Sequence, residues 1–227
     1  MKKYMAMLLA ALCLSGVLMG CEKEPAQPEV SEAAFEAPDE GFGVSADVFV
    51  DALEVSVPQW REDGSAAEAF CDITTKAAAE EIGCQVFRET NTHASYVYYE
   101  ENVYPLGEWV GGQGVVDLQV SDLNADGTPE LLYAYSYSGE KRLWQVGLFD
   151  FADMSDRALV SALYDGYRMM TDVVLEKKNV DSFEINTVKF GDTNGSNPMQ
   201  WPRVPMRWIG RVERVNNAPK VWIGTLN

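Results

Sequence analysis

The chain of 227 residues carries 35 acidic and 18 basic side chains, which gives a formal net charge of −17 at pH 7. Proteins that bind nucleic acid use patches of lysine and arginine to neutralise phosphates, and the sequence has no such patch. The charge balance therefore argues against nucleic acid as a partner. An anionic lipid surface would repel the chain for the same reason.

The N-terminus has the pattern of a bacterial export signal that ends at a cysteine. Lys2 and Lys3 precede an apolar run of about a dozen residues, which is too short to span a membrane and which stops at the letters LMGC, ending in Cys21. The segment resembles bacterial lipoprotein signals, in which that cysteine is acylated and becomes the new N-terminus. The resemblance implies a signal peptide over residues 1–20, a lipid on Cys21 and an extracytoplasmic location at the cell membrane. A plain secretory signal is the alternative.

The segment after the signal is acidic and poor in apolar residues. Removal of residues 1–20 takes away two lysines and no acid, so the net charge of the mature chain is −19. Residues 21–41 contain only Val30 and Phe35 as large apolar side chains, which is too little burial to offset the entropy of ordering. We expect an acidic disordered linker there, followed by one globular domain over residues 42–227.

The globular part is predicted to begin with helices. Apolar residues recur on one helical face over residues 45–55, and Pro58 follows as a stop signal. A second helix is expected from residue 65 or 72 to residue 82. Alanine is abundant there, Ser65 starts a capping box, and Gly83 stands where a C-terminal cap belongs.

Beyond Gly83 the pattern changes to strands. β-branched and aromatic residues cluster in short runs that are separated by turn residues. These runs predict strands over residues 84–89, 95–99, 103–106, 115–120, 131–137, 143–149, 182–190, 206–215 and 220–224. Residues 153–170 are ambiguous and are open to a helix. Together the elements predict an α+β fold, with N-terminal helices followed by a mainly antiparallel β-sheet of hairpins.

Two cysteines, Cys71 and Cys84, lie in the predicted domain, and an oxidising compartment makes a disulfide the first expectation. A helix between them would separate the two Cα atoms by roughly 17–20 Å, whereas a disulfide requires about 7 Å or less. The helix and the disulfide therefore exclude each other. Because the helix signals are local, we predict that the two thiols are not bridged.

The strongest chemical signal is the sequence DLNADGTPE at residues 122–130. It places oxygen-bearing groups at alternate positions, with glycine at the bend, and this suits calcium, a hard cation that takes about six to eight oxygens. The predicted ligands are Asp122, Asn124, Asp126, the Thr128 carbonyl and Glu130. A structural Ca²⁺ is therefore the expected cofactor. The alternative is a hairpin turn in which Asp and Asn bond their own backbone without a metal.

The residues around this loop set its type. A helix-loop-helix calcium site needs glutamate at the twelfth position, where this chain has Tyr133, and the flanking residues alternate as strands do. The loop instead resembles the calcium loops of integrin-type FG-GAP and VCBS repeats. Those families repeat the motif around a propeller, and this chain has one copy, so the resemblance implies only the loop. Residues 103–150 also resemble a segment of uncharacterised lipoproteins of Gram-positive bacteria, a likeness that implies no known activity.

Catalytic motifs are not evident in the sequence. It contains no G-x-S-x-G elbow, no H-E-x-x-H pair and no Walker loop. Its one histidine, His93, lies in a predicted turn between two strands. A catalytic pair of acids for glycoside hydrolysis remains an open alternative, because the sequence does not give the distances between carboxylates.

Aromatic residues form a second candidate site. Tyr133, Tyr135 and Tyr137 alternate along one predicted strand and so share a face, with Trp109 and Trp144 on neighbouring segments. This candidate ligand face would stack sugars or a peptide. The alternative, which we favour, is that the rings pack in the core, because the opposite face of the strand offers too few apolar atoms to be the only buried side.

The sequence thus predicts a membrane-anchored lipoprotein with a calcium-binding hairpin. The leading hypothesis for its role is a non-enzymatic module that binds an envelope or extracellular glycan or protein. The competing hypothesis is a secreted hydrolase, directed at glycan or peptide, whose acids converge only in three dimensions. A deep cleft with two or more acids of shifted pKa would favour the hydrolase, and an exposed aromatic strip would favour the binding module.

Overall fold

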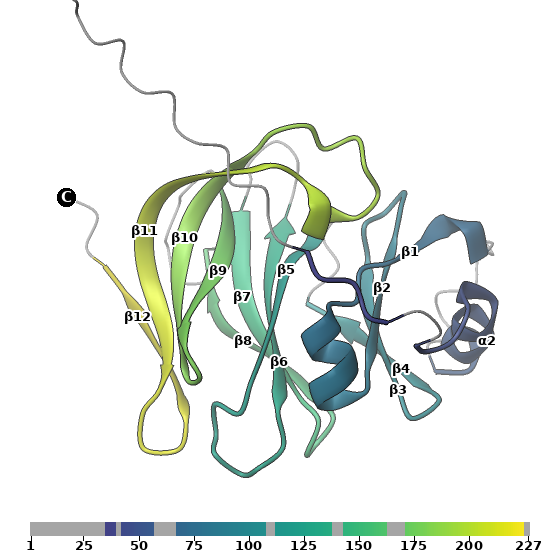
Figure 1. Cartoon of the computed structure of the whole chain (residues 1–227), viewed down its shortest axis with the longest axis horizontal. Coiled ribbons are helices and arrows are strands. Elements are labelled where there is room, and N and C mark those ends of the chain that lie inside the picture. The colour runs from purple at the N-terminus through teal and green to yellow at the C-terminus, as the bar shows by residue number, and fades with distance from the viewer. Residues whose placement is uncertain are drawn as a thin grey trace, which may run out of the picture.

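The computed structural model describes residues 35–39, 42–56, 67–107, 112–137, 143–162 and 171–224. This part of the chain is mainly β: its twelve strands form three antiparallel sheets of four strands each. Figure 1 shows the sheets side by side, with α2 (Ala46–Ser56) at one end of the row, next to the sheet that comes first in the chain. The expected α+β class is therefore wrong, although the first expected helix, over residues 45–55, is present as α2. In the described residues α2 is the one helix longer than two turns.

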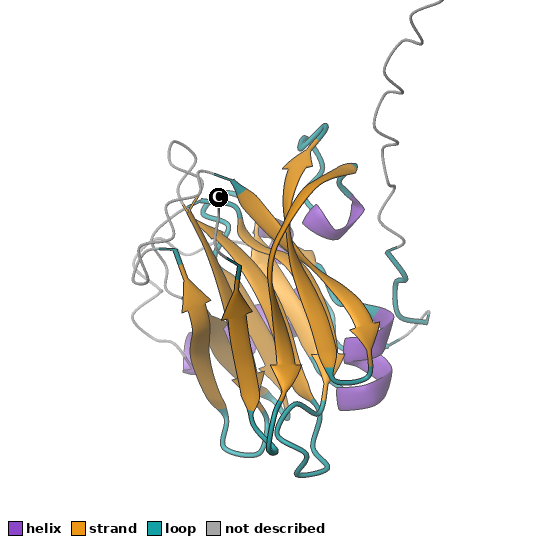
Figure 2. Cartoon of the chain, turned by 90° about the vertical axis from the view of Figure 1, so that its left-hand side faces the viewer, coloured by secondary structure: helices purple, strands orange, loops and turns teal. Residues whose placement is uncertain are grey.

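Each sheet is a meander in which neighbouring strands follow one another in the chain. The N-terminal sheet contains β1 (Phe70–Asp72), β2 (Gln85–Glu89), β3 (Ser95–Tyr99) and β4 (Asn102–Leu106). The central sheet contains β5 (Gly114–Ser121), β6 (Glu130–Tyr137), β7 (Leu143–Asp150) and β8 (Ser155–Ser161). The C-terminal sheet contains β9 (Asp172–Asn179), β10 (Ser182–Phe190), β11 (Arg203–Arg214) and β12 (Pro219–Ile223). Figure 2 shows its strands lying next to one another. The prediction of antiparallel hairpins is confirmed.

The middle strands of the central sheet are buried on both faces, and β6 therefore carries apolar or aromatic side chains on both of its sides. Leu132 and Ala134 on β6 face the C-terminal sheet and pack against residues such as Phe183 and Ile185. The tyrosines that alternate with them face the N-terminal sheet. A third apolar cluster fixes α2 on the outer face of the N-terminal sheet, where the Phe49 ring stacks on Phe87 at 4.1 Å between centroids. The order of layers is therefore helix, sheet, sheet, sheet.

The second expected helix is largely replaced by other structure. Residues Ala67–Ala69 form the 3₁₀ turn η2, and β1 follows and pairs with β2, so that only a short helix remains before Gly83, including the π-helical turn η3 (Ala78–Ile82). Long-range pairing has overridden a local helix preference. Gly83 does cap this turn in the left-handed conformation, with φ of 83°. Ser65, the predicted start of the capping box, lies outside the described residues.

Two further strands were not predicted. β9 was missed, and β8 occupies part of the ambiguous segment at residues 153–170, of which residues 163–170 lie outside the described part. A second 3₁₀ turn, η4 (Pro198–Gln200), connects β10 to β11. None of the helices in the described ranges is long and apolar enough for a membrane crossing.

The N-terminal segment and the cysteines complete the fold. Phe35 packs against the cluster between the N-terminal and central sheets, and the Glu36 carbonyl accepts a hydrogen bond from the Lys76 backbone N–H at 2.8 Å. Part of the expected linker therefore contacts the domain. Cys71 and Cys84 are both free thiols. The helix between them is shorter than expected, because Cys71 belongs to β1 and the helical residues that end with η3 begin only after that strand.

Candidate metal loop and aromatic surfaces

The loop at residues 122–130 connects β5 to β6 and is organised by its own side chains. The Asp122 carboxylate accepts hydrogen bonds from the backbone N–H groups of Asp126 and Gly127, each at 3.2 Å. The Asn124 Oδ1 atom accepts another from Asp126 N–H at 2.9 Å. Gly127 has a φ of 92°, a left-handed conformation that glycine adopts without strain, so the predicted bend is confirmed.

Glu130, the last predicted ligand, is fully buried at the start of β6. Its Oε2 atom accepts a hydrogen bond from Leu123 N–H at 2.6 Å, but its Oε1 atom has no hydrogen-bond partner among the described residues. Burial raises the pKa of Glu130, and the charges of Asp150, Asp122 and Asp126 raise it further. A buried carboxylate oxygen without a donor is costly, so this atom is suited to receive a cation.

The loop as described supports both interpretations of the sequence. In the described residues no three acids, histidines or cysteines converge closely enough to hold a metal ion. The hydrogen bonds of Asp122, Asn124 and Asp126 are those of a turn that needs no metal. A carboxylate oxygen that accepts one N–H bond nevertheless keeps a second lone pair, and Oε1 of Glu130 keeps all of its acceptor capacity. The donor set therefore fits a hard cation, provided that the side chains turn toward it.

The predicted tyrosine face is part of the core. Tyr133, Tyr135 and Tyr137 are each at most 1% exposed, between the central and N-terminal sheets, and Trp144 on β7 is fully buried on the opposite side. Tyr133 Oη donates a hydrogen bond to Asp156 Oδ1 at 2.6 Å, which anchors the ring inside the protein. These residues do not form an open ligand platform, in agreement with the packing interpretation. Trp109 lies outside the described residues.

An exposed aromatic surface occurs instead on the C-terminal sheet, where the sequence analysis did not place one. Trp208 on β11 and Trp222 on β12 are 46% and 43% exposed. They lie on the same face, because a side chain on Gly224, two residues beyond Trp222, would come within 2.6 Å of the Trp208 ring. Lys220 Nζ lies 4.3 Å from the Trp222 ring centroid.

The guanidinium of Arg211 also lies over the Trp222 ring, 5.9 Å from its centroid. We call Trp208, Trp222, Arg211 and Lys220 the indole face. Exposed aromatic rings beside cations are a common feature of binding surfaces, because they combine apolar area with charge. Sequence reasoning missed this face because it selected aromatic residues by their spacing along a strand, and spacing does not tell the buried side from the exposed one.

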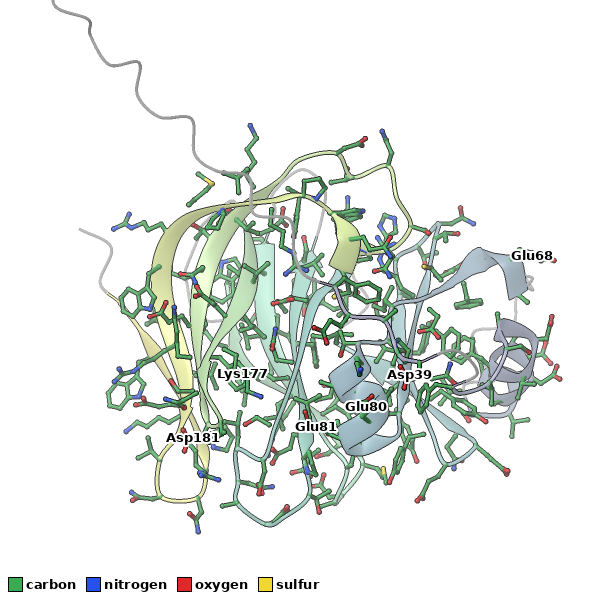
Figure 3. All side chains as sticks on the ribbon, in the orientation of Figure 1. Asp39, Glu68, Glu80, Glu81, Lys177 and Asp181 are labelled. Carbon is green, nitrogen blue, oxygen red and sulfur yellow. The ribbon has the colours of Figure 1, made fainter. Side chains whose placement is uncertain are left out.

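A cavity of about 560 Å³ lies near η3, where side chains of the central and C-terminal sheets meet. Its wall includes Lys76, Asp117 and Arg203, together with Glu80 and Glu81, which Figure 3 labels on η3. Asp117 and Arg203 form an ion pair there. Burial also raises the pKa of two acids, Glu130 and Asp156, but neither lines this cavity.

His93 has a structural role in the turn between β2 and β3. Its Nδ1 atom forms a hydrogen bond with the Gly112 carbonyl, which ties this turn to the segment before β5. Burial lowers the pKa of the His93 imidazole.

No protein-family model matches the chain, and neither does any curated protein or any solved structure.

Proposed function

We propose that this chain is an extracytoplasmic lipoprotein, held at the cell membrane by lipid on Cys21, whose β-domain carries one structural Ca²⁺ in the loop at residues 122–130. Its role is that of a non-enzymatic binding module for an envelope or extracellular glycan or protein. The indole face is the proposed contact surface. The lipoprotein part of the proposal rests on the signal sequence described above.

The observation that carries the calcium part is Glu130. Its Oε1 atom is buried without a donor, directly behind a loop whose side-chain oxygens are spaced for a hard cation. A divalent ion would supply the missing partner and would offset the repulsion among neighbouring carboxylates. Because Glu130 begins β6, at the middle of the three-sheet stack, the ion would stabilise the hairpin on which both sheet interfaces depend.

The binding role is supported by the indole face, which is the exposed aromatic strip expected of a binding module. A hydrolase would instead place its shifted acids in a cleft. Of the two acids with raised pKa, Asp156 accepts hydrogen bonds from Tyr133 Oη and Gly107 N–H, and Glu130 belongs to the calcium loop. No specific observation in the described residues favours the hydrolase.

Thermal unfolding of the full chain in detergent, in EGTA and in millimolar calcium, tests the calcium proposal. We expect calcium to raise the Tm of the wild type, because the ion binds the folded protein and not the unfolded chain. The double variant Asp122→Ala, Asp126→Ala should lose this rise. The variant Asp192→Ala, which removes an exposed acid from a different turn, should keep it. An unchanged Tm in the wild type would overturn the proposal.

A further inference from the structure

The proposed calcium loop lacks one ligand that loops of this spacing normally have. In the helix-loop-helix form, the residue at the twelfth position closes the coordination shell with both carboxylate oxygens. Tyr133 holds this position here, and it is fully buried with its hydroxyl bonded to Asp156. The shell therefore has room for an acid from another part of the chain.

Strand register places one acid beside Glu130. Leu131 on β6 pairs with Phe149 on β7, so the next position outward along this ladder sets Asp150 beside Glu130. Residues opposite each other in an antiparallel ladder point to the same face. The acid at the end of β7 thus stands at the backbone position beside Glu130, although the two residues are far apart in sequence.

Asp150 is also bonded to the loop itself. The Asn124 side-chain amide donates to Asp126 Oδ2 at 3.0 Å and to Asp150 Oδ2 at 3.4 Å, so one amide joins the loop to β7. Asp150 is 6% exposed. Its charge contributes to the raised pKa of Glu130. These observations place the Asp150 carboxylate beside the Asn124 side chain of the loop and near Glu130.

One cationic side chain in the described structure already forms an ion pair with Asp150. Arg157 on β8 lies with Nη2 3.2 Å from Asp150 Oδ2, and its side chain is 45% exposed. A half-exposed guanidinium is free to move away, because its rotamers are restricted little by packing. A single arginine neutralises only one of the four carboxylate charges of this group, which consists of Asp122, Asp126, Glu130 and Asp150.

We propose that Asp150 is a ligand of the calcium ion, supplied by the neighbouring strand in place of the residue at the twelfth position, and that calcium displaces Arg157 from it. This inference rests on the proposed calcium site. It makes the ion a link between the β5–β6 hairpin and β7, and therefore across three strands of the central sheet. It also makes Arg157 a built-in competitor that weakens calcium binding.

Calcium titration of the full chain tests this, with the half-maximal calcium concentration for the rise in Tm as the readout. Asp150→Asn should raise that concentration at least about tenfold, the loss of one charged ligand being worth about 1.4 kcal/mol or more. Asp153→Asn, an exposed acid that caps the next turn, is the matched control and should leave it unchanged. Arg157→Gln should lower it, because the competing cation is gone.

The outcomes separate the two proposals. If the wild type shows no calcium-dependent rise in Tm, the calcium site itself is wrong. If the wild type responds and Asp122→Ala does not, while Asp150→Asn keeps the wild-type midpoint, the site stands and Asp150 is not a ligand. Should Asp150→Asn fail to fold in EGTA, Arg157→Gln decides, since an unchanged or higher midpoint in that variant contradicts the displacement.

Discussion

Arg203 on β11 and Asp117 on β5 form an ion pair between the C-terminal and central sheets, with 2.9 Å between Nη1 and Oδ1. Their side chains are only 13% and 5% exposed. The second oxygen of Asp117 accepts a hydrogen bond from Leu175 N–H at 2.6 Å, so this carboxylate contacts two strands of the facing sheet. Arg203 also donates to the Val116 carbonyl at 3.2 Å. A buried polar contact thus fixes how the two sheets lie against each other.

Replacement of Asp117 by alanine should destabilise the domain strongly. It leaves the Arg203 guanidinium buried without its counter-ion, and the loss of one partner from such a pair costs about 3–5 kcal/mol. Asp181, which pairs with Arg214 near the surface, provides the comparison, because exposed pairs contribute about 0–1 kcal/mol. Urea unfolding of both variants measures the two costs. Equal costs would show that the buried pair has no special role.

Replacement of Glu130 by glutamine should change stability in opposite directions with and without calcium. The raised pKa of Glu130 means that its charged form is disfavoured in the folded state, so without calcium the cost is present at neutral pH. The cost shrinks as the pH falls through the folded pKa toward the ordinary value of 4.5. In EGTA at pH 7 the variant should therefore have the higher Tm, and this advantage should fade on acidification.

In millimolar calcium the wild type should instead have the higher Tm, because glutamine is a weaker calcium ligand than glutamate. Glu81→Gln on the exposed surface of η3 is the control and should follow the wild type in both conditions. A Glu130→Gln variant that is less stable than the wild type in EGTA at pH 7 would contradict the assignment of a costly buried charge.

Replacement of Gly147 by alanine should disrupt the contact between β6 and β7. The added methyl group would overlap the ring of Tyr133, whose hydroxyl is fixed by Asp156. Overpacking of this kind costs about 1–3 kcal/mol, and each kcal/mol lowers the Tm of a domain of this size by about 2–4 °C. Gly195→Ala is the matched control, since its methyl group would meet its nearest neighbour, Trp201, at an ordinary 3.7 Å. Calorimetry of both variants is the check.

The two thiols of the domain should differ in reactivity. Burial raises the pKa of the Cys84 thiol to about 12, whereas Cys71 is only half-buried. Because the thiolate is the reactive form, Cys84 should resist a thiol reagent at pH 8 in the native state and react in denaturant. A Cys13→Ser, Cys21→Ser variant of the full chain isolates these two residues for titration. Fast native labelling of Cys84 would contradict the described burial.

The indole face should be dispensable for folding and required for binding. Purified peptidoglycan is a suitable probe for an envelope ligand, with sedimentation of the full chain as the measurement. The double variant Trp208→Ala, Trp222→Ala should remain in the supernatant while its Tm stays close to that of the wild type, because both rings are about half exposed. Val55→Ala, which shortens an exposed side chain on α2, should sediment with the glycan. Retention of the double variant on the glycan would exclude the face as the contact.

Most strands were predictable because alternation within a strand is a local property. The number of sheets was not predictable from the sequence, because β6 is buried on both faces. Its tyrosines and its small apolar residues then alternate between two cores rather than between core and solvent. The helix predicted for the Ala-rich segment before Gly83 was wrong for a related reason. Phe70 pairs with Glu89, a partner that lies nineteen residues away, and this pairing outweighed capping and alanine content.

For the candidate site, the sequence located the loop and its bend but not the surroundings. Asp150 is brought beside Glu130 by the register of β6 and β7, which depends on the length of the connecting segment. The exposure of Trp208 depends on which side of the last sheet the rest of the protein covers. Neither property is contained in the spacing of residues within one strand.

The meander arrangement has a consequence for a chain that is still being made. Each sheet pairs only strands that are neighbours in sequence, so the first two sheets can form before the last has emerged, and such local pairing favours fast folding. At that stage the face of the central sheet that carries Leu132 and Trp144 is still bare. A chain interrupted near residue 162 would therefore present an apolar sheet to its neighbours, and this intermediate would be prone to aggregate.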